Sequence, residues 1–216
     1  TIYHHSFLDT RTKELVYDTT DFYFRSPSVF SKDGSMYTYS KSYIPRYSTD
    51  TMTRVYVKDV YTHRLIFYKE YPYRSISSLD FSHDSKTLAI GLSYSEESIE
   101  MPEAYFWDIQ TYEELYRLNS NSTSSFYMLF NPVESEVVVI RNDIKVLDTD
   151  TFSEIGRIDE HIAFSFAISN DGNLIYNDGW GDDLYDLRTF SKYYIYERYE
   201  SAYYNRFSPQ DLLIGC

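Results

Sequence analysis

Apolar and polar residues alternate along most of the chain in short segments, which is the period of β-strands. The clearest series lies in and around the stretch Leu79–Leu118. It predicts four consecutive strands, which we place at Ile76–Ser82, Thr87–Tyr94, Glu103–Ile109 and Glu113–Leu118. No segment repeats apolar residues every 3.6 positions over the length that a stable helix needs. The pattern therefore predicts an all-β protein.

An Asp-x-x-Thr sequence follows an apolar strand at five places along the chain. Its aspartates stand at intervals of 38 to 50 residues and are Asp9, Asp59, Asp108, Asp148 and Asp186. In such a turn the Asp side chain accepts hydrogen bonds from amides further on, and the Thr hydroxyl closes the turn. Five copies at similar spacing indicate a repeat, and we expect these aspartates to be structural.

A second signal alternates with the first: a short apolar strand ends in Ser or Asn, and a polar turn follows. The anchor residues are Ser31, Ser82, Asn131, Ser169 and Ser208. Turn sequences such as Asp-Gly and Asn-Pro follow them, which is typical of hairpins. Each repeat therefore contains strand A, a hairpin, strand B, a loop, strand C, the Asp-x-x-Thr turn and strand D. Repeats of about 40 to 45 residues with four antiparallel strands are typical of β-propeller blades.

The repeats divide residues 1–216 into five blades of a single β-propeller domain. Four blades are complete, at about residues 27–69, 76–118, 126–158 and 164–197. Residues 1–20 supply only strands C and D, and residues 202–216 supply only strands A and B. We expect these two segments to form one composite blade, because this closes a five-blade ring and removes exposed strand edges. The alternative is a fragment of a larger propeller, since the chain stops within a predicted strand.

The second repeat resembles a WD40-type repeat. An inner strand ending in Phe81-Ser82 precedes a polar hairpin, an apolar strand, the pair Trp107-Asp108 and a turn that contains Thr111. Five copies of this pattern cover essentially the whole chain, although only this copy has the Trp-Asp pair. The Gly-His pair that members of the family often have before strand A is missing. The resemblance implies a propeller scaffold that displays loops to protein partners, usually without catalysis.

Two long loops connect strands B and C in consecutive blades, at about Lys41–Met52 and Ser95–Pro102. In a propeller these loops share a face with the connections from strand D to the next strand A. The intervening connection contains Tyr and Arg, which are frequent interface anchors. We therefore predict a partner-binding patch that comprises Tyr43, Arg46, Tyr47, Tyr71, Tyr73, Arg74, Glu97 and Met101. The alternative is that these loops differ only because surface loops tolerate change.

The charge of the chain narrows the possible partners. It has 33 Asp and Glu against 20 Lys and Arg, which gives a formal net charge of -13. Nucleic acids and anionic membranes are therefore unfavourable partners, because both bind clustered Lys and Arg. A basic protein partner is compatible with this charge. No apolar run is long enough to predict a membrane span.

Signals for metals and catalysis are weak. The chain has neither a nucleophile elbow nor a phosphate-binding loop. The single Cys216 and five scattered histidines give no zinc-ligand spacing, so we expect no metal and no cofactor. We therefore expect a non-catalytic protein-interaction scaffold. The alternative is a carbohydrate-binding or glycoside-hydrolysing propeller, whose candidate carboxylates would be Asp80, Glu160 and Glu200.

Overall fold

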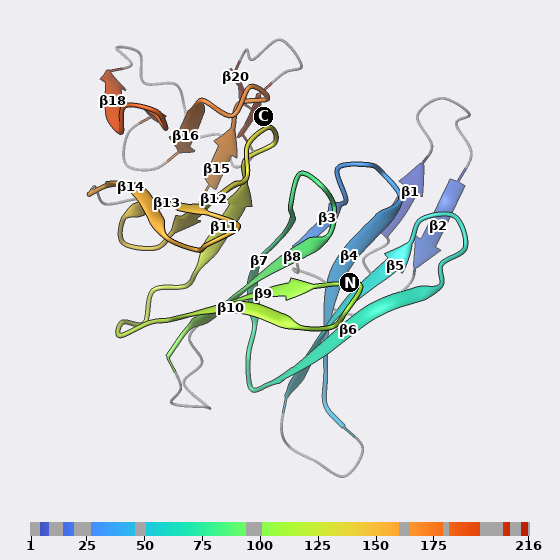
Figure 1. Cartoon of the computed structure of the whole chain (residues 1–216). Coiled ribbons are helices and arrows are strands. Elements are labelled where there is room, and N and C mark those ends of the chain that lie inside the picture. The colour runs from blue at the N-terminus through green and yellow to red at the C-terminus, as the bar shows by residue number, and fades with distance from the viewer. Residues whose placement is uncertain are drawn as a thin grey trace.

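The computed structural model of the chain describes residues 5–8, 15–19, 27–45, 51–93, 101–159, 165–178, 182–194, 205–207 and 213–215. Within these ranges every regular element is a β-strand, so none of the described residues forms a helix that could cross a membrane. The strands form four four-stranded antiparallel sheets and two two-stranded sheets (Figure 1). The prediction of an all-β fold built from repeated four-stranded antiparallel sheets is confirmed.

Each four-stranded sheet takes its strands in chain order. The first sheet contains β3 (Ser28–Phe30), β4 (Met36–Tyr43), β5 (Met52–Asp59) and β6 (Leu65–Pro72). The second contains β7 (Ile76–Phe81), β8 (Thr87–Leu92), β9 (Glu103–Asp108) and β10 (Glu114–Asn119). The third contains β11 (Tyr127–Phe130), β12 (Glu136–Ile140), β13 (Ile144–Asp148) and β14 (Glu154–Ile158). The fourth contains β15 (Ser165–Ile168), β16 (Leu174–Asp178), β17 (Asp182–Asp186) and β18 (Ser191–Tyr194).

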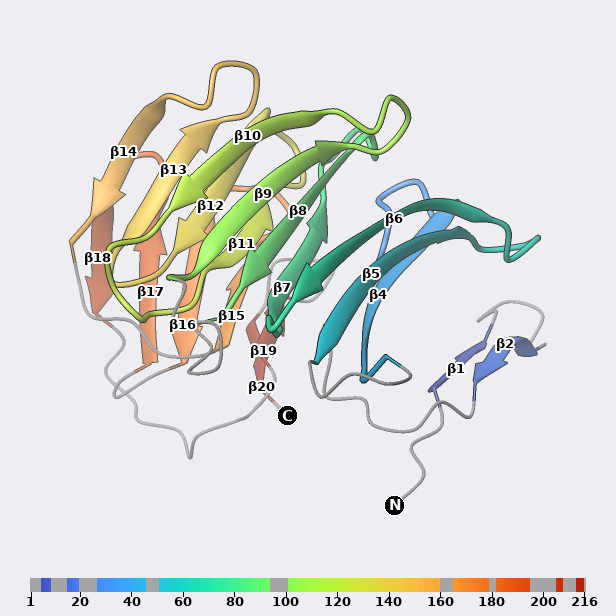
Figure 2. The same cartoon turned by 90° about the horizontal axis from the view of Figure 1, so that it is seen from below.

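The four sheets stack face to face in chain order (Figure 2). Their first strands lie innermost, where β7 contacts both β3 and β11. One apolar cluster fills each space between consecutive sheets. The first cluster includes Phe67 and Phe81, the second includes Phe106 and Met128, and the third includes Tyr185. Strands near the middle of a sheet are buried on both faces, which explains why β12 is apolar at almost every position. In the outer strands β10 and β14, more buried and more exposed side chains alternate instead, because one face of each strand meets solvent.

The turn between strands C and D packs against the preceding sheet, and the same contact occurs between three pairs of consecutive sheets. The residue after its Thr adopts a positive φ angle in each four-stranded sheet, at His63, Tyr112, Phe152 and Phe190. The Tyr112 ring lies 5.3 Å from Phe67 of the preceding sheet, and Phe152 stacks 4.4 Å from Tyr116. The Phe190 ring covers Gly156, where a Cβ atom would overlap it. The contacted residues Phe67, Tyr116 and Gly156 occupy equivalent positions in their sheets. Each pairs with the strand C residue that stands two places before the turn Asp.

The two terminal strand pairs form separate sheets. β1 (His5–Leu8) pairs with β2 (Leu15–Thr19), and β19 (Asn205–Phe207) pairs with β20 (Leu213–Gly215). Among the described residues, no ladder joins one pair to the other. The single composite sheet that the sequence predicts is therefore not formed in this part of the chain, and the closed ring stays a prediction.

Candidate functional site

The candidate site lies on the face formed by the connections from strand B to strand C and from strand D to the next strand A. In an antiparallel sheet taken in chain order, these connections share one end of the sheet. Two surface depressions reach this face and bring such connections from consecutive sheets together, and the larger one extends along the outer strands to Phe152. This is the face on which the sequence placed the partner-binding patch. The structure describes five of the eight patch residues, while Arg46, Tyr47 and Glu97 lie outside the described residues.

Tyr71 is buried rather than displayed. Only 7% of its surface is exposed, and its ring lies 5.4 Å from that of Tyr105 in the second sheet. The indole Nε1 of Trp107 donates a hydrogen bond to its Oη at 3.1 Å. Burial raises the pKa of the Tyr71 hydroxyl well above its usual range. The expectation that Tyr71 is an exposed anchor is wrong, because the residue faces the inter-sheet core.

Arg74 is also buried, with 3% of its surface exposed. Its Nη2 donates to the carbonyl oxygen of Met101 at 2.7 Å and lies 3.5 Å from Glu103 Oε2. A buried guanidinium needs such partners, since an unpaired buried charge is strongly unfavourable. Arg74 therefore fixes the end of the loop at Met101, and as placed its side chain is not a free contact for a partner. The Met101 side chain itself is 42% exposed.

Tyr43 is the last residue of β4, at one end of the first sheet. The guanidinium of Arg54 sits 4.5 Å above its ring, and its hydroxyl donates to Glu70 Oε1 at 3.1 Å. Arg54 also pairs with Glu70, so the three side chains form one cluster. Tyr73 has a φ of 57° at the turn that follows β6. The structure thus brings Arg74 and Met101 together but places Tyr43 in a different group.

The turn aspartates have the hydrogen bonds that the Asp-x-x-Thr sequence predicts. Asp148 Oδ1 accepts the Thr151 amide at 2.7 Å and the Thr151 hydroxyl at 2.7 Å. Equivalent amide bonds reach Asp59, Asp108 and Asp186. These donors lower the pKa of all four carboxyl groups, because they stabilise the ionised form. Asp9 lies outside the described residues.

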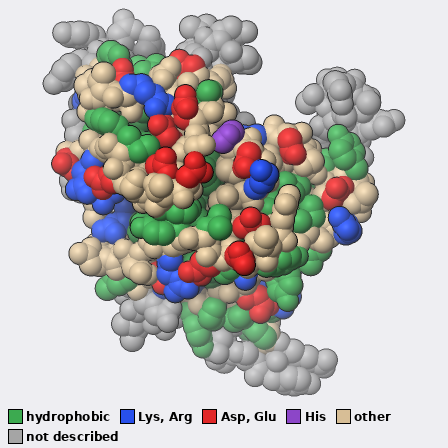
Figure 3. Space-filling model, in the orientation of Figure 1, with side chains coloured by type: hydrophobic (Ala, Val, Ile, Leu, Met, Phe, Trp, Pro, Cys, Tyr) green, Lys and Arg blue, Asp and Glu red, His purple; other side chains and the backbone are tan. Residues whose placement is uncertain are grey.

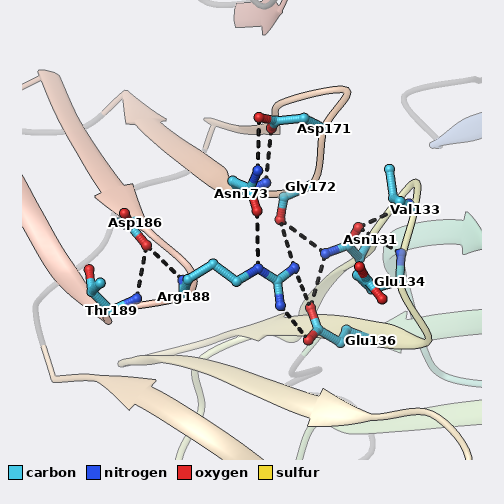
Figure 4. A network of polar contacts seen from close by, with 10 residues as sticks. All are labelled: Asn131, Val133, Glu134, Glu136, Asp171, Gly172, Asn173, Asp186, Arg188 and Thr189. Carbon is cyan, nitrogen blue, oxygen red and sulfur yellow. Dashed lines mark hydrogen bonds and ion pairs between the residues drawn. The ribbon is translucent and has the colours of Figure 1, made fainter.

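The hairpin anchors divide into two kinds. Ser31, Ser82 and Ser169 each donate to an Asp two residues on, which keeps the hairpin local. Asn131 instead uses its Oδ1 for its own hairpin and donates from Nδ2 to the Gly172 carbonyl of the fourth sheet at 3.0 Å (Figure 4).

The same network ties the third sheet to the fourth through an ion pair. Arg188, on the fourth sheet's turn between strands C and D, donates to both oxygens of Glu136 at 2.7 and 3.0 Å. Such bidentate pairs fix orientation as well as adding energy. Asn131 and the Glu136–Arg188 pair therefore link the third sheet to the fourth, which is a structural role.

Asp80, the one described member of the possible catalytic carboxylates, is engaged in structural contacts. Its Oδ2 accepts the Phe130 amide of the third sheet at 2.7 Å. Its Oδ1 accepts its neighbour's amide and lies 3.5 Å from Lys32 Nζ of the first sheet. Burial raises the pKa of Asp80, and Lys32 and the two amides oppose that rise. Asp80 thus links three sheets, while Glu160 and Glu200 lie outside the described residues.

The two depressions adjoin each other and share Asn119 and Ser120. The smaller, of about 490 Å³, lies beside Arg74 and Met101. The larger, of about 1020 Å³, lies between β10 of the second sheet and the outer strands of the third. We call this larger depression the inter-sheet groove. The sequence interpretation missed it, although the polar Asn119–Ser125 connection between two strands is a visible signal on this face.

Within the described ranges, no group of three or more His, Cys, Asp or Glu side chains is placed to hold a metal ion. The chain matches no protein-family model, and no curated protein matches it.

Proposed function

We propose that the chain is a non-catalytic protein-interaction scaffold of WD40-like propeller type, which receives partners on the face that holds the inter-sheet groove. The two adjoining depressions are the observation that carries this proposal. They combine floors of buried and half-buried apolar side chains with rims of amide, hydroxyl and charged side chains. This arrangement of an apolar centre and a polar rim is typical of protein interfaces.

The terminal strand pairs support the propeller arrangement. β1 pairs with β2 through a register shift at Phe7/Leu8, as strand C pairs with strand D in the first three sheets. Both views place this pair on the side of the first sheet that faces away from the second (Figures 1 and 2). At the other end, β19 contacts β15 as β11 contacts β7. The register shift of the first pair and the contact of the second with β15 support our proposal that both pairs contribute to a fifth blade.

The contacts of Asp80 and Tyr39 argue against a role of these two residues in glycan hydrolysis or binding. Both oxygens of Asp80 are occupied by structural hydrogen bonds, so it is poorly placed for acid–base chemistry on a sugar. Tyr39 stacks against Tyr37 and Tyr56, with ring centroids 5.9 and 5.1 Å away. Its ring faces are thus used within the protein instead of forming a platform for a sugar.

Surface charge is consistent with a protein partner. On the side shown in Figure 3, acidic and basic described side chains are interspersed, with apolar ones between them. A nucleic-acid site would instead gather Lys and Arg on one face.

A paired selection tests the proposal. The folded chain is immobilised and screened with a random dodecapeptide library displayed on phage, and in parallel with a glycan array and chromogenic glycosides. We expect enriched peptide families whose binding is lost when the chain is heat-unfolded. Glycan binding or glycoside hydrolysis without peptide enrichment would overturn the proposal.

A further inference from the structure

The inter-sheet groove lies where the third sheet lacks an aromatic side chain that both neighbouring sheets have. The strand C residue directly before the turn Asp faces the preceding sheet. It is Trp107 in the second sheet and Tyr185 in the fourth, but Leu147 in the third. The two aromatic residues pack against the apolar clusters that fill their interfaces. The interface between the second and third sheets therefore has no aromatic ring at this position.

Consecutive sheets are close together at their inner strands and diverge toward their outer ones. On the inner side the second sheet presents Gly91, where a Cβ atom would overlap the Phe126 carbonyl of the third sheet. Ala89 and Ala104 are similarly small and fully buried. Larger side chains are needed to fill the space between the outer strands. Whether a groove opens there depends on the size of those side chains.

The preceding interface shows what fills this outer space. The Trp107 ring lies there with its centre 6.1 Å from that of Phe67 and 6.2 Å from that of Tyr105. Its Nε1 donates to Tyr71 Oη at 3.1 Å, and Lys69 Nζ lies 3.7 Å from the centre of its ring. An indole is thus held by aromatic packing, one acceptor oxygen and one cation.

The strand pairing identifies the groove residues that stand at the equivalent positions, and all of them line the groove. In the order Trp107, Tyr105, Tyr71 and Lys69, the equivalent residues are Leu147, Lys145, Ser120 and Leu118. The aromatic pair at the turn end is present in both interfaces. Beyond that pair, three rings of the first interface have no counterpart in the second. Their absence leaves the depression of about 1020 Å³.

The groove offers an indole the same kinds of contact. Leu118 and Leu147 form apolar walls on the two facing sheets. Ser120 Oγ accepts a hydrogen bond from the Ser122 amide at 2.9 Å, and a hydroxyl oxygen can accept a second one. Lys145, whose side chain is 35% exposed, adds a cation beside the apolar walls.

We propose that the inter-sheet groove binds a Trp side chain that a partner protein inserts between the second and third sheets. The indole takes the place that Trp107 has in the preceding interface, packs on Leu118 and Leu147, and donates its N–H to Ser120. This inference rests on the proposed scaffold function and specifies the residue by which the partner is recognised. Trp side chains in well-packed pockets often contribute a large share of binding energy.

Saturation-transfer NMR with single amino-acid probes tests the groove. The probes are N-acetyl-L-tryptophanamide and N-acetyl-L-leucinamide, each titrated into the folded chain. The first variant is Leu147→Trp, which gives the third sheet the residue that the second sheet has. Its control is Leu115→Trp, because Leu115 is 43% exposed and does not line the groove. The second variant is Leu118→Gln, which makes one wall polar without adding charge, with Leu115→Gln as its control.

We expect the tryptophan probe to bind the parent chain at least ~10-fold more tightly than the leucine probe. Leu147→Trp should unfold at the same urea concentration as the parent or a higher one, and should lose binding because its own indole fills the groove. Leu118→Gln should weaken binding about 10-fold, and both Leu115 controls less than about twofold. Equal affinities of the two probes, or equal binding by a variant and its control, would overturn the inference. If Leu147→Trp does not fold, Leu118→Gln against its control decides.

The phage selection separates this inference from the scaffold function. We expect the selected peptides to share a Trp whose replacement by Ala weakens binding to the parent chain about 10-fold or more. If the selected peptides share no Trp, or bind Leu147→Trp as they bind the parent chain, the groove assignment fails while the scaffold function stands. If no peptide is selected and glycans bind, both fail.

Discussion

At the scale of single residues, the hairpin between strands A and B shows how one substitution changes what an anchor does. Ser31, Ser82 and Ser169 complete their own hairpins, whereas Asn131 at the same place donates to Gly172 of the next sheet. Asn has both a donor and an acceptor, so its acceptor can hold the hairpin while its donor reaches outward. Gly172 has a φ of 74°, and a Cβ atom there would overlap the Asn131 side chain.

We predict that Gly172→Ala destabilises the protein more than Gly34→Ala. Both residues have positive φ, at 74° and 71°, but a Cβ atom at Gly34 would meet no atom within 4 Å. Gly34→Ala should cost only the backbone strain, about 1 kcal/mol. Gly172→Ala should cost about 3 kcal/mol, because the Asn131 side chain must also move and lose its hydrogen bond. Urea unfolding measures both values, and equal costs would show that the overlap is relieved without loss.

At the scale of elements, the turn between strands C and D performs two tasks. Its Asp and Thr fix the turn locally, and the residue that follows the Thr packs on the outer strand of the preceding sheet. The left-handed backbone at Tyr112, Phe152 and Phe190 costs energy in a residue with a side chain. Aromatic packing between sheets offsets this cost, which explains large residues where Gly would be less strained.

The turn carboxylates predict a pH dependence of stability. Asp59, Asp108, Asp148 and Asp186 have folded pKa values below the usual 3.8, chiefly because the turn Thr donates to each carboxylate. A lowered folded pKa gives stability that is present above the unfolded pKa and is lost as pH falls through the folded pKa. A variant with Asn at all four positions should be less stable than the parent at pH 7. The difference in unfolding free energy should narrow as pH falls below about 4.

Urea unfolding at pH 7, 5, 4 and 3 measures this difference. Asp150→Asn, which removes a charge from the same turn as Asp148, is the control for net charge. A difference that stays constant from pH 7 to pH 3 would contradict the assigned role of the carboxylates.

At the scale of the whole molecule, the same packing relation repeats from sheet to sheet. Turn aromatics join the first sheet to the second, the second to the third and the third to the fourth. Buried polar bonds reinforce these contacts, through Asp80 at the inner strands and through the Glu136–Arg188 pair. A repeated packing relation generates a stack of sheets, and the closure of that stack into a ring stays a prediction.

Deletion of the two chain ends tests that closure. Three shortened chains lack residues 1–20, residues 202–216 or both. If the segments share one blade, loss of either leaves the other without a sheet partner, so the double deletion should cost less than the sum of the single ones. The free energy of unfolding in urea measures the three costs. Additive costs would show that the two segments stabilise the molecule independently.

Much of the fold could be predicted from sequence, because its determinants are local. In the second sheet the predicted strand bounds differ from the observed ones by at most two residues. The alternation of apolar residues and the chemistry of the Asp-x-x-Thr turn both act within a few positions. They do not depend on what lies across the molecule.

The candidate site was predicted only as a face. Counting strands is enough to place the connections at one end of each sheet, but it does not say which side chains on them are free. Tyr71 and Arg74 looked like interface anchors by residue type, yet packing against Tyr105 and Glu103 buries them. The inter-sheet groove depends on how two sheets diverge, and no local pattern encodes that angle.

The sequence by itself determined the strands, their order and the turns, since each follows from residues close together in the chain. Only the tertiary structure decided which polar residues became links between sheets and where a groove opened. Asp80, Asn131 and Arg74 acquire their roles from partners that are 27 to 50 residues away in the chain. The physical reason is that burial and pairing, which set the role of a polar group, are properties of neighbours in space.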